Sequence, residues 1–146
     1  MEKNNVDILL VEDNINDAEL TIRALRKGNV LNNLIHLKDG AEALNFLFCT
    51  GPYSGRDRNN RPKVILLDLK MPKVGGLEVL EKLKSDEFTR QIPVVVLTSS
   101  KEDPDVKACY NYGVNSYIVK PVGFENFTKV VGDLGMYWLL LNQEPT

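Results

Sequence analysis

Short runs of apolar, often β-branched residues recur five times along the chain and predict five β-strands. The runs are VDILLV (residues 6–11), LIHL (34–37), KVILLDL (63–69), PVVVLT (93–98) and SYIV (116–119). Runs of this length and composition are typical of strands. The third and fourth runs are apolar at almost every position, which favours central parallel strands that helices cover on both faces.

Between and after these strands, apolar residues recur at helical spacing and predict five helices. The first two begin with capping pairs, in which an Asn or Asp is followed three residues later by Glu. These pairs are Asn16 with Glu19 and Asp39 with Glu42. We expect the third helix to start after Gly75-Gly76, the fourth to have Pro104 in its first turn, and the last to cover about residues 124–142.

The alternation of strands and helices over 146 residues predicts a single α/β domain spanning residues 1–146. We expect a (βα)5 arrangement with a doubly wound, five-stranded parallel sheet of the flavodoxin-like type. The rules for crossover connections favour the strand order 2-1-3-4-5, with the switch point between the first and third strands. Ligands of such sheets bind at that point, outside the carboxyl ends of the strands.

Polar side chains stand at the carboxyl ends of four predicted strands. They are Glu12 and Asp13 after the first, Asp68 at the end of the third, Thr98 at the end of the fourth and Lys120 after the fifth. Because these ends meet at one edge of the sheet, we expect three carboxylates, a hydroxyl and an ammonium to converge there. Three carboxylates in a partly desolvated cleft repel each other, so they predict a bound cation. Oxygen ligands favour Mg²⁺, which also binds phosphate groups.

The same residues suit phosphoryl transfer. Asp68 would be the nucleophile that forms a covalent acyl phosphate, Lys120 would neutralise a phosphoryl oxygen, and Thr98 would hydrogen-bond another. Taken one at a time, each has a plainer interpretation: the acidic pair as a helix cap, Thr98 as a turn residue and Lys120 as a solvated lysine. The hypothesis depends on the joint occurrence of suitable groups at all four strand ends.

Four segments in this order, VEDN, ILLDLKMPKVGG, VVVLTSS and SYIVKP, resemble the motifs of receiver domains of bacterial two-component response regulators. The resemblance covers about residues 6–141. It implies that Asp68 is the phosphoacceptor and a Mg²⁺ ligand, with Mn²⁺ or Ca²⁺ as possible substitutes. It further implies that Asp13 binds the metal directly, Glu12 through water and Lys70 through its main-chain carbonyl.

The resemblance also implies a switch. Thr98 would be the switch hydroxyl, Lys120 the phosphate-binding lysine, and Tyr117 the aromatic ring that turns inward when the hydroxyl moves. The peptide bond between Lys120 and Pro121 would be cis, which is a minority state for X-Pro bonds. Without the resemblance, Tyr117 would be interpreted as a half-exposed strand tyrosine.

More narrowly, the DNINDAEL segment, the polar, basic loop at residues 50–62 and the Trp138 region resemble small stand-alone regulators that partner cyanobacterial phytochromes. A sensor histidine kinase, with a phytochrome as the candidate, is therefore the expected phosphoryl donor. We expect a signalling protein and not an enzyme. No DNA-binding or catalytic output domain follows in the chain, so we expect output through contact with another protein or through a shift in self-association; the downstream protein stays open. The expected face for readout and for a homodimer comprises the fourth helix, the fifth strand and the fifth helix, with the surplus apolar residues Met136, Tyr137, Leu139 and Leu140.

The net charge of −2 argues against binding to nucleic acid or to an anionic membrane surface. No segment approaches the roughly 20 apolar residues of a membrane span, and no signal peptide is visible, so we expect a cytoplasmic location. One alternative is an aspartyl-phosphate phosphohydrolase of the haloacid dehalogenase class, which generally has a second acid where this chain has Lys70. Another is a pseudo-receiver that binds partners without phosphorylation. A flavodoxin-like cofactor binder lacks support, because no Gly-rich phosphate loop follows the first strand.

Overall fold

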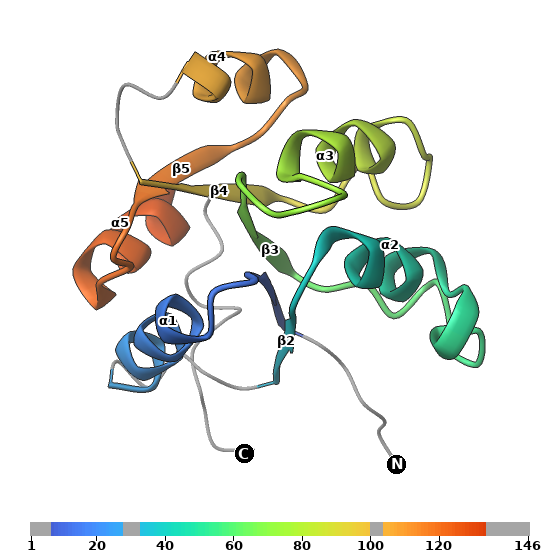
Figure 1. Cartoon of the computed structure of the whole chain (residues 1–146), viewed down its shortest axis with the longest axis horizontal. Helices are drawn as coiled ribbons and strands as arrows, with labels where there is room; N and C mark the ends of the chain where they lie inside the picture. Colours follow the sequence, from blue (N-terminus) through green and yellow to red (C-terminus); the bar gives the residue numbers. More distant parts are fainter. Residues whose placement is uncertain (1–6, 28–32, 100–103, 134–146) are drawn as a thin grey trace.

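The computed structural model describes residues 7–27, 33–99 and 104–133, which form a five-stranded parallel sheet with helices on both faces (Figure 1). The strands are β1 (Ile8–Val11), β2 (Leu34–Leu37), β3 (Val64–Asp68), β4 (Val94–Thr98) and β5 (Ser116–Val119). The helices are α1 (Ile15–Lys27), α2 (Gly40–Phe48), α3 (Gly76–Lys84), α4 (Pro104–Asn111) and α5 (Phe124–Asp133). The predicted fold class and the strand order 2-1-3-4-5 are confirmed.

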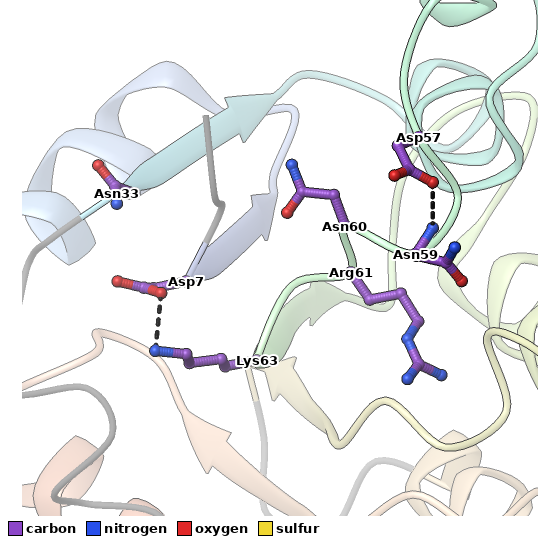
Figure 2. A pocket seen from close by; sticks show the side chains of 7 residues that line it. All are labelled: Asp7, Asn33, Asp57, Asn59, Asn60, Arg61 and Lys63. Atoms are coloured by element: carbon purple, nitrogen blue, oxygen red, sulfur yellow. Dashed lines mark hydrogen bonds and ion pairs between the residues drawn. The ribbon is translucent and has the colours of Figure 1, made fainter. Parts of the chain in front are cut away.

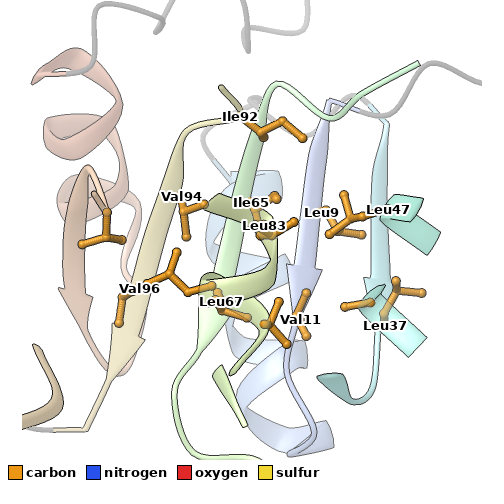
Figure 3. Close-up of a cluster of buried hydrophobic side chains, with 14 of the residues drawn as sticks. Leu9, Val11, Leu37, Leu47, Ile65, Leu67, Leu83, Ile92, Val94 and Val96 are labelled. Atoms are coloured by element: carbon orange, nitrogen blue, oxygen red, sulfur yellow. The ribbon is translucent and has the colours of Figure 1, made fainter. Parts of the chain in front are cut away.

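Two apolar cores lie on opposite faces of this sheet, because alternate residues of a strand point to opposite faces. One core packs against α2, α3 and α4, and its strand residues include Leu9, Val11, Ile65, Leu67, Val94 and Val96 (Figure 3). The other core packs against α1 and α5, and its strand residues include Ile8, Leu10, Val64, Leu66, Val95 and Leu97. The almost continuously apolar runs are therefore central strands that are buried on both faces, as their composition predicts.

The start of α1 differs from the predicted one. Asn14 caps this helix: its Oδ1 accepts a hydrogen bond from the Asp17 amide at 3.0 Å, and its carbonyl accepts one from the Ala18 amide at 2.9 Å. The predicted capping pair of Asn16 and Glu19 is wrong, because Asn14 lies closer to the end of β1 and the helix begins directly after it. The earlier start places Asp17 in the first turn of α1.

The other described helix boundaries agree with the sequence. The Asp39 side chain accepts a hydrogen bond from the Glu42 amide at 2.8 Å, so the capping pair of α2 is confirmed. Helix α3 begins at Gly76, one residue before the predicted start, and α4 begins at Pro104. The predicted continuation of α5 beyond Asp133 lies outside the described residues, as do the surplus apolar residues expected there. None of the described helices has the length and apolar character needed to cross a membrane.

The segment 50–62, expected to be a surface loop, has structure of its own. It contains the short 3-10 helix η1 (Gly51–Tyr53). The Arg56 guanidinium carbon lies 3.7 Å from the centroid of the Phe46 ring of α2, a cation–π contact. The loop is therefore fixed to the end of α2.

The same segment leads to a polar hollow at the amino ends of β1 and β3 (Figure 2). There the Lys63 ammonium pairs with the buried Asp7 carboxylate at 3.1 Å. Asn60 and Arg61 also line this hollow. It lies at the opposite end of the sheet from the carboxyl ends of the strands, where the predicted chemistry is placed.

Candidate functional site

The carboxyl ends of β1, β3, β4 and β5 surround a small polar pocket of about 230 Å³. Its lining contains the predicted residues Glu12, Asp13, Asp68, Lys70, Thr98 and Lys120, together with Asn14, Asp17 and Ser99. The structure thus brings together the residues predicted for metal binding and phosphoryl transfer. They come from four strand ends because neighbouring parallel strands finish at the same edge of the sheet.

Three carboxylates of this pocket lie close enough to share one cation. Glu12, Asp13 and Asp68 each offer an oxygen, and these three oxygens lie within 4.8 Å of one another. Glu12 and Asp68 are almost completely buried, with 1% and 4% of their surface exposed, whereas Asp13 is exposed. The pairing of Val11 with Leu67 in adjacent strands brings the first two side by side.

The electrostatics of Asp68 indicate a site that needs positive charge. Burial and the neighbouring Glu12 carboxylate raise the pKa of Asp68 to about 7, although the Lys120 ammonium and the Lys70 amide act in the opposite direction. The buried Glu12 Oε1 lies 3.0 Å from the Lys120 ammonium, which balances its charge. An oxygen-only set with this excess of negative charge fits a hard divalent ion such as Mg²⁺.

Lys120 lies among three carboxylates. Its Nζ is 3.0 Å from Glu12 Oε1, 3.0 Å from Asp17 Oδ2 and 3.3 Å from Asp68 Oδ1. Burial alone would lower the pKa of Lys120, but the bonds to Glu12 and Asp17 and the charge of Asp68 outweigh it and raise that pKa. Lys120 is therefore a permanent cation at this site. The peptide bond that joins it to Pro121 is cis.

Thr98 and Tyr117 lie on the same face of the sheet. Thr98 is the buried last residue of β4, and Tyr117 of β5 is paired in register with Val96, two residues earlier in β4. Tyr117 is half-buried, and its ring meets the Tyr110 ring of α4 edge to face at a centroid distance of 6.2 Å. Thr98 and the aromatic pair that links β5 to α4 therefore lie on the same face of the sheet.

Gly76 allows α3 to start directly behind Asp68. A Cβ at this position would lie 2.5 Å from the Asp68 main-chain oxygen and 2.7 Å from Leu69 Cα. The Gly76 amide donates a hydrogen bond to the Leu69 carbonyl at 2.9 Å. The backbone of Asp68 can occupy its position only because residue 76 has no side chain.

Sequence reasoning missed two residues of this site. Asp17 reaches Lys120 from α1, although in the sequence it resembles an ordinary acid in the first turn of a helix. His36 of the edge strand β2 places its Nε2 2.8 Å from the Glu12 carbonyl oxygen, so the ring donates a hydrogen bond to the backbone of the acidic residue. Two features of the sequence could have pointed to them: Asp17 is an acid in the first turn of the helix that follows the first strand, and His36 is the only histidine of the chain.

Comparison with known proteins agrees with this geometry. A family model described as the response regulator receiver domain matches residues 8–132. A curated protein described as "Probable methanogenesis regulatory protein FilR2", from Methanothrix harundinacea, is 43% identical over 138 residues, which is 94% of this chain and 86% of that protein. Response regulator Rcp1 from Synechocystis is 40% identical over 132 residues, which is 90% of this chain and 88% of that protein.

Solved structures give the same result. The bacteriophytochrome response regulator RtBRR is 49% identical and has a TM-score of 0.86. The match covers 96% of this chain and 84% of RtBRR. The Mn²⁺-bound form of Rcp1 is 38% identical and has a TM-score of 0.74. The match covers 97% of this chain and 99% of Rcp1. The protein therefore belongs to the family of response regulator receiver domains.

Proposed function

We propose that the protein accepts a phosphoryl group on Asp68 from a sensor histidine kinase and passes the signal on through protein contacts. The observation that carries the proposal is the buried Asp68 carboxylate at the end of β3, flanked by the acidic pair and by the Lys120 ammonium. A signalling protein of this kind uses its own carboxylate as the acceptor and does not turn over an external substrate. Its family membership favours this function over a phosphohydrolase.

In the proposed reaction, an Asp68 carboxylate oxygen forms a bond to phosphorus while the bond between phosphorus and the kinase histidine nitrogen breaks. The electron pair of the broken bond stays on the histidine nitrogen. Lys120 balances the negative charge of the phosphoryl oxygens, and its Nζ already lies 3.3 Å from Asp68 Oδ1. Thr98, at the adjacent strand end, supplies a hydroxyl to another phosphoryl oxygen. No other group of the chain has to act as a base, because Asp68 attacks as the carboxylate, the form that Lys120 and a bound divalent ion would favour.

The same carboxylates are the proposed ligands of Mg²⁺, with Mn²⁺ or Ca²⁺ as substitutes. Asp13 and Asp68 would bind the ion directly, Glu12 through water and Lys70 through its main-chain carbonyl. The ion would neutralise charge between the Asp68 carboxylate and the incoming phosphoryl group. The fit of the three converging carboxylates supports this proposal, as does the Mn²⁺-bound structure of the relative Rcp1.

Readout is proposed on the face formed by α4, β5 and α5, including a homodimer through that face. Support comes from Tyr117, which lies beside β4 and contacts α4 through Tyr110. A phytochrome is the proposed kinase, because a solved relative is a bacteriophytochrome response regulator. We further propose that residues 1–146 act as one receiver domain in the cytoplasm and without contact to nucleic acid.

Intact-protein mass spectrometry tests the proposed phosphoacceptor. Incubation with Mg²⁺ and acetyl phosphate should add one phosphoryl group to the wild-type protein and none to the Asp68→Asn variant. The matched control is Asp57→Asn, which removes the same charge at an exposed position in the loop at the other end of the sheet and should label like wild type. Equal labelling of Asp68→Asn would place the acceptor elsewhere.

A further inference from the structure

We propose that Asp17 is a positioning residue for Lys120, which it holds ready for the phosphoryl group. The proposal rests on the function proposed above and assigns to α1 a part in the chemistry at the strand ends. Its basis is a 3.0 Å contact between Lys120 Nζ and Asp17 Oδ2, which is both a hydrogen bond and an ion pair between residues far apart in the sequence.

The three N–H bonds of the Lys120 ammonium match the three carboxylates around it. Glu12 and Asp68 approach from inside the pocket and are buried, whereas the Asp17 side chain keeps 38% of its surface exposed at the rim. A lysine has four rotatable side-chain bonds and no preferred direction for its charge. Three acceptors on three elements therefore define where this ammonium lies.

Asp17 differs from the other two partners in being outside the cluster of possible metal ligands, which contains Glu12, Asp13 and Asp68. A bound divalent ion would draw charge from Glu12 and Asp68 and weaken their hold on Lys120. Phosphorylation would then convert the Asp68 carboxylate into an acyl phosphate, so that the N–H bond it had accepted becomes available to a phosphoryl oxygen. Throughout these changes Asp17 remains a carboxylate that the reaction does not use.

The fold explains why Asp17 can reach this lysine. Strand alternation places Glu12, Asp68 and Lys120 on the face covered by α1 and α5. The residues two positions before these three are Leu10, Leu66 and Ile118, and all belong to the core on that face. The Asn14 cap fixes the backbone of Asp17 in the first turn of α1 by accepting its amide hydrogen.

A plainer role for Asp17 is helix stabilisation, because a negative charge is favourable in the first turn of a helix. The two roles predict opposite effects on binding of beryllofluoride, an anionic mimic of the phosphoryl group. If Asp17 acted only through its charge, removing that charge would strengthen the binding of an anion. If Asp17 positions Lys120, removing it weakens that binding.

The test is a calorimetric titration of the full chain with beryllofluoride at saturating Mg²⁺. We expect Asp17→Asn to weaken beryllofluoride binding by about tenfold, the loss typical of one charge-assisted hydrogen bond. Its Mg²⁺ affinity, measured separately, should change by less than about threefold, because Asp17 is not among the metal-binding carboxylates. Unchanged or tighter beryllofluoride binding overturns the proposal.

Two further variants complete the design. Glu19→Gln removes the same charge from an exposed position of the same helix and should bind beryllofluoride like wild type. Asp17→Glu keeps the carboxylate and should recover at least part of the affinity for beryllofluoride. This variant also keeps the proposal testable if Asp17→Asn does not fold. A Glu19→Gln variant as weak as Asp17→Asn would show that loss of any acid from α1 weakens beryllofluoride binding, and would refute positioning. Failure of the wild-type protein to bind beryllofluoride would instead refute the proposed function.

Discussion

At the scale of single residues, the site contains more buried negative charge than its one ammonium group can balance. Two buried carboxylates, Glu12 and Asp68, lie beside one ammonium. Burial, together with the neighbouring Glu12 charge, raises the pKa of Asp68 to about 7. Removing a charge from water costs free energy unless an opposite charge or hydrogen bonds replace the hydration. Lys120 meets only part of this need, since it is shared among three carboxylates. The site is therefore arranged to accept a cation.

Among the three carboxylates, Asp13 is the one whose replacement tests cation binding most directly. It is the exposed member of the three carboxylates, so its main contribution is as a ligand and not to packing. Asp13→Asn removes a charge and a proposed direct ligand, and we expect Mg²⁺ affinity to fall about tenfold or more, as for loss of a strong charged contact. Isothermal titration measures this.

Glu87→Gln provides the control for Asp13→Asn, because Glu87 is exposed between α3 and β4, away from the pocket lining. It loses the same formal charge and should keep wild-type Mg²⁺ affinity. An Asp13→Asn variant that binds Mg²⁺ as tightly as this control would show that the ion binds elsewhere.

At the scale of elements, the strand pairing connects chemistry to the outer surface. Thr98 ends β4. Tyr117 pairs with Val96, two residues earlier in β4, on the same face of the sheet and in contact with Tyr110 of α4. In the proposed switch, a Thr98 hydroxyl that moves toward a phosphoryl oxygen would leave space on the side of Tyr117. The few kcal/mol that such a hydrogen bond contributes are enough to shift a population between two arrangements.

Hydrogen exchange can follow this coupling. Addition of beryllofluoride and Mg²⁺ should change amide protection in α4 and β5 of the wild-type protein, and light scattering should show whether the dimer fraction rises. In Thr98→Ala the change in protection should be largely lost, because the group that moves is absent. The same protection change in both proteins would contradict readout through Thr98, and a dimer that forms equally without the mimic would be constitutive.

At the scale of the whole molecule, the raised pKa of Asp68 makes stability depend on pH. The unfolded chain releases the Asp68 proton near the ordinary carboxyl pKa of 3.8, whereas the folded protein retains it until about pH 7. Folded protein therefore binds more protons over this range, and its free energy of unfolding falls as pH rises. A shift of about three pKa units corresponds to at most about 4 kcal/mol, reduced where solvent screens the site.

Urea unfolding without divalent metal at about pH 5 and about pH 8 checks this dependence. Other carboxylates titrate as well, so the informative quantity is the difference between wild type and Asp68→Asn. The Asn variant should gain stability relative to wild type as pH rises, and saturating Mg²⁺ should remove most of that gain. A difference that does not change with pH would mean that Asp68 is ionised in the folded protein throughout this range.

The fold could be predicted almost completely from the sequence. Strand ends such as Asp68 and Thr98 could be recognised because apolar runs mark the central strands, and parallel strands bring their carboxyl ends together. The cap of α1 could not be chosen by pattern alone, because Asn14 and Asn16 both precede helical spacing. Only the distance from β1 decides between them.

The contacts between the site residues were harder to predict from the sequence than the residues themselves. The approach of Asp17 to Lys120 depends on how α1 is rotated about its axis on the sheet, and local periodicity gives that rotation only coarsely. The bond between His36 and the Glu12 carbonyl depends on the register of β2 against β1, which pairs Leu10 with His36. Neither the rotation of α1 nor the register of β2 can be deduced from the residues of one segment alone.

The absence of a side chain at Gly76 also constrains how this sequence can change over time. A methyl group there would collide with the backbone of the reacting strand, so a lineage that altered position 76 would first have to move α3. Exposed positions on the same helix, such as Glu81 and Lys82, carry no such restriction. Among descendants of this protein, variation along α3 should therefore be uneven: one invariant position that never touches a reactant, followed by surface positions that drift freely. Invariance would here record the space required by a neighbouring backbone and not a contact with any ligand.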